Sequence, residues 1–252
     1  MMHVQMSRPF VALALIAGVA VSASAAVAQT APAKAYAMTV KNDDGFISVT
    51  LKARKARVAD IASDLGKRLR ADVVIGKDLA QDTVTLDMPS SPLEAVLQAL
   101  APRVLVDYEI RQDARPLPLA IHLLAPTDTE PTANIVQRGA SQGVVISGHT
   151  EETASDGEPV TITGDLHQLS IAAKNQPLAL VAMMVADMLG VTLDLNYPAG
   201  ELVVVDVDKL PAEDAVLSIS PNIRMHVRAD LSRAERTPIK LIVTRTDARA
   251  AR

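Results

Sequence analysis

Residues 47–124 carry an ordered series of hydrophobic and polar patterns. Ile47, Val49 and Leu51 alternate with polar residues, which is the two-residue period of a half-buried strand. A stripe at helical spacing comes next, made of Val58, Ile61, Leu65 and Leu69. Further patterns predict short strands over 71–75 and 83–88, a second helix over 93–100, and a closing hairpin over 104–111 and 117–124. The series therefore predicts two helices packed on a small sheet.

The second predicted helix has a start signal of its own. Ser91, Pro92 and Glu94 take the N-cap, the first and the third helical positions. This arrangement is a capping box, in which the serine and glutamate side chains bind backbone N–H groups that the helix leaves unpaired. We therefore expect Ser91 to cap this helix and Pro102 to end it.

The same order of patterns returns at an offset of about 120 residues. The strings TVTLDM and YEIRQD, from Thr83 and Tyr108, align with LVVVDV and MHVRAD, from Leu202 and Met225. A conserved order of several such strings indicates an internal duplication. The fold class that this predicts is α+β, with two tandem βαββαββ modules, each a small sheet packed with two helices.

The two predicted modules, residues 45–126 and 165–247, are separated by a segment of different composition. Residues 127–164 are rich in Thr, Ser, Gly, Pro and acidic residues, which predicts a flexible linker with a short strand at 143–146. A structureless loop of this length is unusual inside one compact domain, so two separable modules are expected.

The first 28 residues resemble an export signal. Arg8 precedes an apolar run over 10–20, and the small residues that follow end in Ala26-Val27-Ala28. The run is shorter than a membrane anchor requires, so cleavage after Ala28 is predicted. Since no cysteine is present, disulfides, thiolate metal sites and lipid attachment at the cleavage point are excluded. The mature chain is expected in the periplasm, with no transmembrane segment.

Charge is distributed unevenly along a chain of net charge −4. Residues 127–165 hold seven acidic residues against Arg138, and residues 221–252 hold eight basic residues against three acidic ones. Solvated faces are the simplest explanation. The basic end also supplies a candidate contact surface for an acidic partner, made of Arg224, Arg228, Arg233, Arg236 and Lys240.

With these patterns in place, the first module resembles the short N-terminal domain shared by secretins and TonB-dependent transducers. The resemblance covers about residues 46–112 and rests on RVADIASDL from Arg57, VVI from Val73, VTLDMPSSPLEAVLQAL from Val84, and Tyr108. The second copy fits the pattern more weakly. In that family the module binds other periplasmic proteins, so the resemblance implies an envelope partner such as a secretin, pilus or transducer component. It also allows an oligomer.

Sites for chemistry find little support. Gly139-Ala140-Ser141-Gln142-Gly143 matches a nucleophile motif with His149 nearby, but a strand-like run follows where that motif requires a helix. The histidines lack metal-ligand spacing, and the near absence of aromatic residues removes a stacking platform for nucleic acid. Asn42 to Gly45 predicts a turn before the first strand rather than a calcium loop. No catalytic residue, cofactor or metal site is therefore predicted.

The helix predicted from Leu178 is apolar on more than one face, and its methionines include Met183, Met184 and Met188. Packing against the first module is the favoured explanation, and contact with a partner is the alternative. Taken together, the sequence predicts a non-enzymatic periplasmic interaction protein, an accessory or adaptor of an outer-membrane secretion, pilus or TonB-type signalling system. The alternative is a small-ligand or cell-wall binding protein that uses the cleft between the modules.

Overall fold

The computed structural model describes residues 35–131, 159–196 and 201–245. Signal peptide, cleavage position, the 143–146 strand and the Ser141 and His149 positions fall outside these residues. The α+β prediction is confirmed, because helices and extensive β-sheet alternate along the chain.

In the first half, the elements are β1 (Tyr36–Asp43), β2 (Phe46–Arg57), α1 (Val58–Leu69), β3 (Asp72–Ile75), a 3₁₀ turn (Leu79–Gln81), β4 (Thr83–Pro92), α2 (Leu93–Leu100), β5 (Arg103–Arg111) and β6 (Leu117–Leu124). The second half contains β7 (Thr161–Gly164), β8 (Leu169–Pro177), α3 (Leu178–Leu189), β9 (Thr192–Leu195), β10 (Leu202–Leu210), α4 (Ala212–Leu217), β11 (Ile223–Asp230) and β12 (Glu235–Val243). Each half thus begins with one strand more than predicted.

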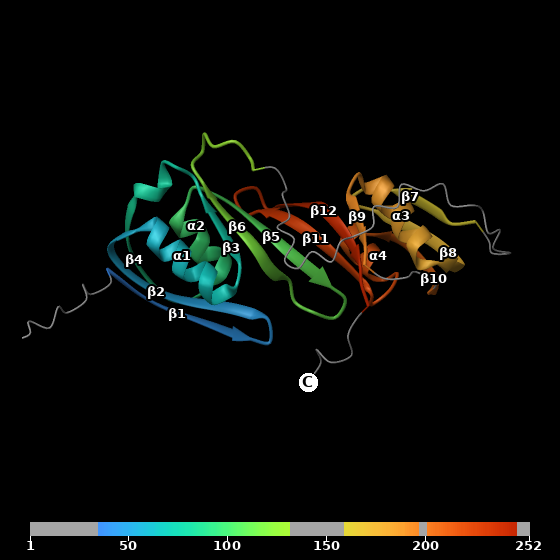
Figure 1. The fold of residues 1–252 in the computed structure, drawn as a ribbon, viewed down its shortest axis with the longest axis horizontal. Helices are drawn as coiled ribbons and strands as arrows, with labels where there is room; N and C mark the ends of the chain where they lie inside the picture. Colours follow the sequence, from blue (N-terminus) through green and yellow to red (C-terminus); the bar gives the residue numbers. More distant parts are fainter. Residues whose placement is uncertain (1–34, 132–158, 197–200, 246–252) are drawn as a thin grey trace, which may run out of the picture. The chain divides into compact units, whose positions relative to one another are not determined.

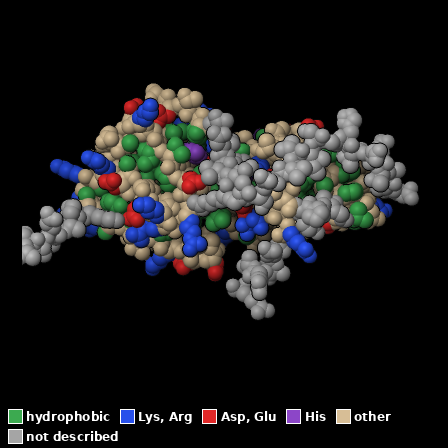
Figure 2. All heavy atoms as spheres, in the orientation of Figure 1, with side chains coloured by type: hydrophobic (Ala, Val, Ile, Leu, Met, Phe, Trp, Pro, Cys, Tyr) green, Lys and Arg blue, Asp and Glu red, His purple; other side chains and the backbone are tan. Residues whose placement is uncertain are grey.

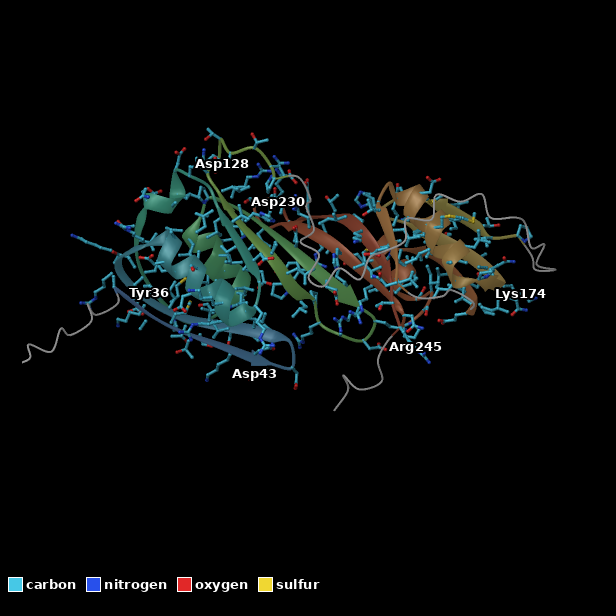
Figure 3. The ribbon with its side chains drawn as sticks, viewed as in Figure 1. Tyr36, Asp43, Asp128, Lys174, Asp230 and Arg245 are labelled. Carbon is cyan, nitrogen blue, oxygen red and sulfur yellow. The ribbon has the colours of Figure 1, made fainter. Side chains whose placement is uncertain are left out.

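The extra strand of the first half is β1, which pairs antiparallel with β2. Tyr36 and Asp43 mark its two ends (Figure 3). Asp44 and Gly45 both have positive φ and form the two-residue turn of this hairpin, the type I′ geometry that an Asp-Gly pair favours. The turn expected before the first strand is therefore the turn between the first two strands. In the second half, β7 occupies the end of the segment expected to be a linker.

Three sheets organise the described chain, with strand orders β1-β2-β4, β10-β8-β7 and β3-β6-β5-β11-β12-β9. α1 and α2 contact β2 on one side and β3 and β5 on the other, so they lie between two sheet layers. α3 and α4 lie likewise between β8 and the strands β9, β12 and β11. The buried apolar residues of both halves belong to one contiguous cluster.

The six-stranded sheet is continuous through both halves, because β5 of the first half pairs antiparallel with β11 of the second (Figure 1). The two segments were expected as independent modules, and the pattern of either hairpin alone gives no signal for this pairing. Alternation specifies which side chains face the core, but it does not specify which strand will cover a hairpin's free edge.

The predicted capping box is wrong, although the helix itself is confirmed. β4 continues through Ser91, which pairs with Val49, and the helix starts at Leu93 with Pro92 as its N-cap residue. The Ser91 hydroxyl donates to the Pro89 carbonyl instead. Glu94 accepts a hydrogen bond from the Tyr108 hydroxyl at 2.9 Å. Sheet pairing thus holds Ser91 extended, away from the helix N–H groups.

The positions of two β-bulges give an alignment of the β5–β6 and β11–β12 hairpins that differs from the predicted one. The β5–β6 register shifts between Asp107 and Tyr108, where Pro118 lies opposite, and the β11–β12 register shifts between His226 and Val227, opposite Pro238. A proline cannot donate to the ladder, and a bulge accommodates it. Relative to its bulge, Tyr108 therefore occupies the same place as Val227, two residues from the Met225 of the predicted alignment. A slip of two preserves the alternation, so the pattern alone could not detect it.

Candidate functional site: the charged seam and the apolar face of α3

Strands β5 and β11 pair over seven positions, from Arg111 opposite Arg224 to Leu105 opposite Asp230. On the helix side of the sheet these strands present buried apolar residues such as Val106, Met225 and Val227. The other side carries what we call the charged seam, which consists of Asp107, Glu109, His122, His226 and Arg228. Their exposed fractions lie between 5% and 9%. Buried charges of this kind require partners.

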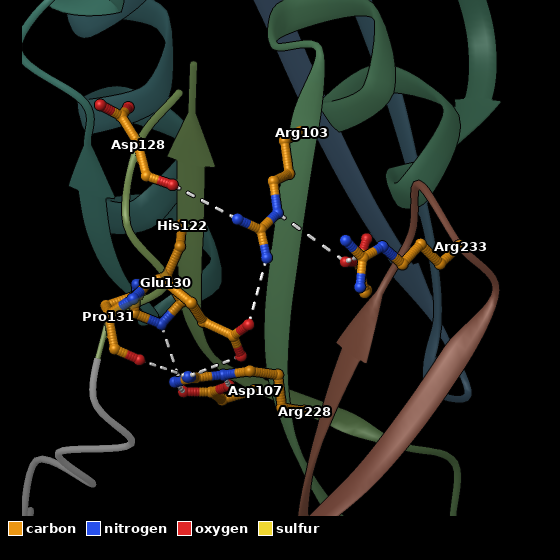
Figure 4. A network of polar contacts seen from close by, with 9 residues as sticks. Arg103, Asp107, His122, Asp128, Glu130, Pro131, Arg228 and Arg233 are labelled. Carbon is orange, nitrogen blue, oxygen red and sulfur yellow. Dashed lines mark hydrogen bonds and ion pairs between the residues drawn. The ribbon is translucent and has the colours of Figure 1, made fainter. Parts of the chain in front are cut away.

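Asp107 and Arg228 form the centre of the seam (Figure 4). The Arg228 Nε and one terminal nitrogen donate to the two carboxylate oxygens of Asp107 at 2.7 and 2.9 Å. The other terminal nitrogen donates to the Pro131 carbonyl oxygen at 2.6 Å. His122 Nε2 lies 3.2 Å from the same carboxylate. The two-point contact fixes the orientation of both side chains and joins the two halves.

A second cross-strand pair lies two residues along β5. His226 Nε2 is 3.4 Å from Glu109 Oε2, and Arg224 is 3.5 Å from Glu109 Oε1. Arg111, on the same strand as Glu109, also donates to this carboxylate. Glu109 thus receives contacts from both halves of the chain.

These contacts control the ionisation of the carboxylates. Burial by itself raises the pKa of Asp107, but hydrogen bonds from Arg228 and His122 outweigh burial and hold that pKa below its ordinary value. Burial acts likewise on Glu109, and the hydrogen bonds from His226 and Arg111 with the charges of Arg111 and Arg224 lower its pKa to about 2. The hydrogen bond to Asp107 raises the pKa of Arg228. All three groups are therefore charged near neutral pH.

The arrangement fits the pairing of two strands better than catalysis. Each carboxylate is occupied by cationic or imidazole partners, so neither is placed as a free acid or base. Within residues 35–131, 159–196 and 201–245, no group of three His, Asp or Glu side chains could hold a metal ion. The seam was not predicted, although one signal existed: Asp107 and Glu109 interrupt the outer face of an otherwise apolar strand.

The five basic residues predicted as one partner surface lie in three environments. Arg228 and Lys240 are buried, and Lys240 binds Asp194 at 2.8 Å. Arg224 contacts Glu109, as described. Only Arg233 and Arg236 are exposed, and they pair with Asp230 and Glu213 at 3.8 and 3.1 Å. A count of basic residues along a hairpin does not reveal which carboxylates the fold brings against it, and a shared contact surface for all five stays a prediction.

α3 differs from α1 most clearly in the chemistry of its outward face. The buried positions correspond one to one, since Val58, Ile61, Ala62, Leu65 and Gly66 match Leu178, Val181, Ala182, Val185 and Ala186. Where α1 exposes Ser63 and Arg68, α3 exposes Met183 and Met188, with exposed fractions of 51% and 41%. Hydrophobic side chains, in green, reach the surface near the right-hand end of the space-filling view, the end at which α3 lies (Figure 2). The expected packing of these methionines on the first module is therefore wrong.

A shallow groove of about 540 Å³ lies between the halves on the helix side of the six-stranded sheet. Tyr108 and Ala229 line it together with Phe46, Glu94 and Arg236. The Arg115 guanidinium stands 5.8 Å from the centre of the Phe46 ring. Burial, followed by the charge of Glu94, raises the pKa of Tyr108, so this hydroxyl stays protonated and serves as a donor.

Comparison with known proteins adds no relative. The chain matches no family model, no curated protein and no solved structure. In the part of the chain that the structure describes, no helix has the length and apolar character needed to cross a membrane.

Proposed function

We propose that this chain is a non-enzymatic, periplasmic protein–protein interaction protein, an accessory or adaptor of an outer-membrane secretion, pilus or TonB-type signalling system. The observation that carries the proposal is the apolar outward face of α3. Two exposed polar positions of α1, Ser63 and Arg68, are methionine in α3 and also exposed there, so the fold itself does not require apolar residues at these positions. Flexible, polarisable methionines are common at protein-binding surfaces.

The layout of two copies of a module like the short N-terminal domain of secretins and TonB-dependent transducers belongs to the same proposal. Three observations support it: the shared order of elements, the matching buried positions of α1 and α3, and the two bulges opposite Pro118 and Pro238. Both copies would then offer helix faces and sheet edges to a partner.

A crosslinking pull-down from the native envelope tests the proposal. The tagged chain is compared with Met183→Ser/Met188→Arg, which installs the first half's residues on α3, and with Leu117→Ser, which changes a similarly exposed apolar residue on β6. We expect the α3 variant to lose specific envelope proteins that the unchanged chain and the Leu117 variant capture. Identical captures by all three chains, or no capture by any, would contradict the proposal.

A second candidate is binding of a small cell-wall ligand in the groove between the halves. Two of the few aromatic residues, Phe46 and Tyr108, line this groove, and Phe46 is 46% exposed. Co-sedimentation with purified cell-wall sacculi tests it, with Phe46→Ala as the binding variant and Leu117→Ser as the control. Sedimentation unaffected by Phe46→Ala would exclude the groove.

A further inference from the structure

The pairing of β5 with β11 has a local two-fold relation. Tyr108 and Val227 each lie directly after the register shift in their own hairpin, so they occupy equivalent positions. They are also paired with each other where β5 meets β11. An axis through a pair of equivalent residues relates each strand to the other, as in an isologous dimer interface. The flanking pairs, Asp107 with Arg228 and Glu109 with His226, therefore occupy equivalent environments on opposite sides of the axis.

Charge breaks this symmetry. Both carboxylates of the central pairs come from β5, and both basic partners come from β11. Arg224 adds a third contact of the same polarity, at 3.5 Å from Glu109. One ion pair across the seam has the opposite polarity, Arg103 with Asp230, but it lies at the end of the strands and its atoms are 3.8 Å apart. The buried centre is thus acidic on one strand and basic on the other.

We propose that this polarity makes the seam a heterotypic recognition surface: β5 accepts a β11-type strand, from the same chain or from a second copy, and rejects another β5. In a β5–β5 pair about the same axis, position 107 would face position 109, so Asp107 would meet Glu109 twice. A β11–β11 pair would likewise place His226 against Arg228. In a β5–β5 pair the two carboxylates at each position would keep only His122 and Arg111 of their own half as partners, and a β11–β11 pair would place two basic side chains together. Like charges buried against each other in this way disfavour self-association of either half.

Recognition between the halves is independent of the proposed envelope partner. A single charge reversal on β5 should turn that strand into a self-complementary one, whereas reversal of both acidic positions should not.

The test uses the full chain with Asp107→Arg, Asp107→Asn, and the double reversal Asp107→Arg/Glu109→Arg. In the first variant the new guanidinium faces Arg228 within the chain, but in a β5–β5 pair it faces Glu109 of a second copy. We expect its mass, measured by light scattering at roughly 100 µM chain, to double relative to the unchanged chain. The tethered β11 competes at an effective concentration on the order of millimolar, about tenfold higher, so the like charges at positions 107 and 228 must weaken the pairing within the chain by more than about tenfold. The neutral and double variants should keep the mass of the unchanged chain.

Amide hydrogen exchange identifies the surface that dimerises. In the Asp107→Arg dimer, amides of β5 (103–111) should stay protected while those of β11 (223–230) exchange at least about tenfold faster. The reciprocal variant Arg228→Asp, which would face His226 in a β11–β11 pair, should show the opposite pattern. Doubling by all variants, or doubling by neither single reversal, would overturn the proposal. So would a chain that is merely unfolded in both single reversals, as far-UV circular dichroism would reveal.

Discussion

Replacing Arg228 with methionine should destabilise the protein strongly at neutral pH and much less in acid. Arg228→Met leaves Asp107 buried with His122 as its remaining contact. Removing one member of a buried ion pair costs about 3–5 kcal/mol because the other charge stays without compensation. His122 retains one contact to the carboxylate, so we expect the lower end, about 3 kcal/mol. For a chain of this size that corresponds to a fall in Tm of roughly 6–12 °C.

The pH dependence follows from the same carboxylate. In the unchanged protein the lowered pKa of Asp107 means that its contacts stabilise the fold above the unfolded pKa, and this stability is lost as the pH falls through the folded pKa. Without Arg228, burial dominates and raises the pKa of Asp107. Protonation of Asp107 as the pH falls then removes the buried, uncompensated charge of the variant. The destabilisation by Arg228→Met should therefore begin to shrink above the ordinary aspartate pKa of about 3.9 and keep shrinking as the pH falls further.

A double variant separates an unpaired charge from lost packing. Arg228→Met/Asp107→Leu removes both charges, and the His122 ring and the Pro131 carbonyl each lose one contact, so we expect a cost of about 1–2 kcal/mol. Urea unfolding is followed by far-UV circular dichroism, because the chain has no tryptophan. If the double variant were as unstable as Arg228→Met alone, packing rather than charge pairing would account for the loss, which contradicts a stabilising role of the Asp107–Arg228 pair.

Three further changes test separate contacts. Glu109→Gln should remove up to about 3 kcal/mol of stability at neutral pH, because the pKa of about 2 means that the unchanged chain loses this stability only between roughly pH 4.5 and 2. Urea titrations at several pH values measure the free energy of unfolding of both chains. Parallel plots of that free energy against pH would contradict the prediction. Tyr108→Phe should cost about 1 kcal/mol by leaving Glu94 without its hydroxyl donor, with Tm as the readout; an unchanged Tm would show the bond to be neutral. Gly66→Ala should cost about 1–3 kcal/mol, because a Cβ would lie 2.5 Å from Val73 Cγ2. The same melting experiment measures this loss, and an unchanged Tm would show that the Val73 side chain moves without cost.

Local patterns predicted most of the helices and strands. The stripe from Val58 to Leu69 became α1 with the bounds it implied, and the closing hairpin became β5 and β6. These predictions succeeded because each element's own residues specify its period and its buried face. β1 was missed although Asp44-Gly45 is a strong hairpin signal, because the turn was assigned to the start of the fold rather than to a pair of strands.

The candidate site could be predicted from the sequence only in small part. Arg228 and Lys240 were grouped with Arg233 and Arg236 as a surface, yet their carboxylate partners come from residues 121 and 46 positions away. Sequence distance of this kind leaves no local pattern. The exposed methionines of α3 were visible as an apolar excess, but only burial showed that Met183 and Met188 face solvent.

Most of the secondary structure, the repeated order of patterns and the absence of cysteine chemistry follow from the sequence alone, since these depend on neighbouring residues and composition. Tertiary structure decided that β5 and β11 join the halves in one sheet, that Asp107 meets Arg228, and that Tyr108 corresponds to Val227. The physical reason is that the free edge of a strand carries the same backbone donors and acceptors whatever its sequence. Its partner is selected by side chains distant in the chain, which only the folded structure brings together.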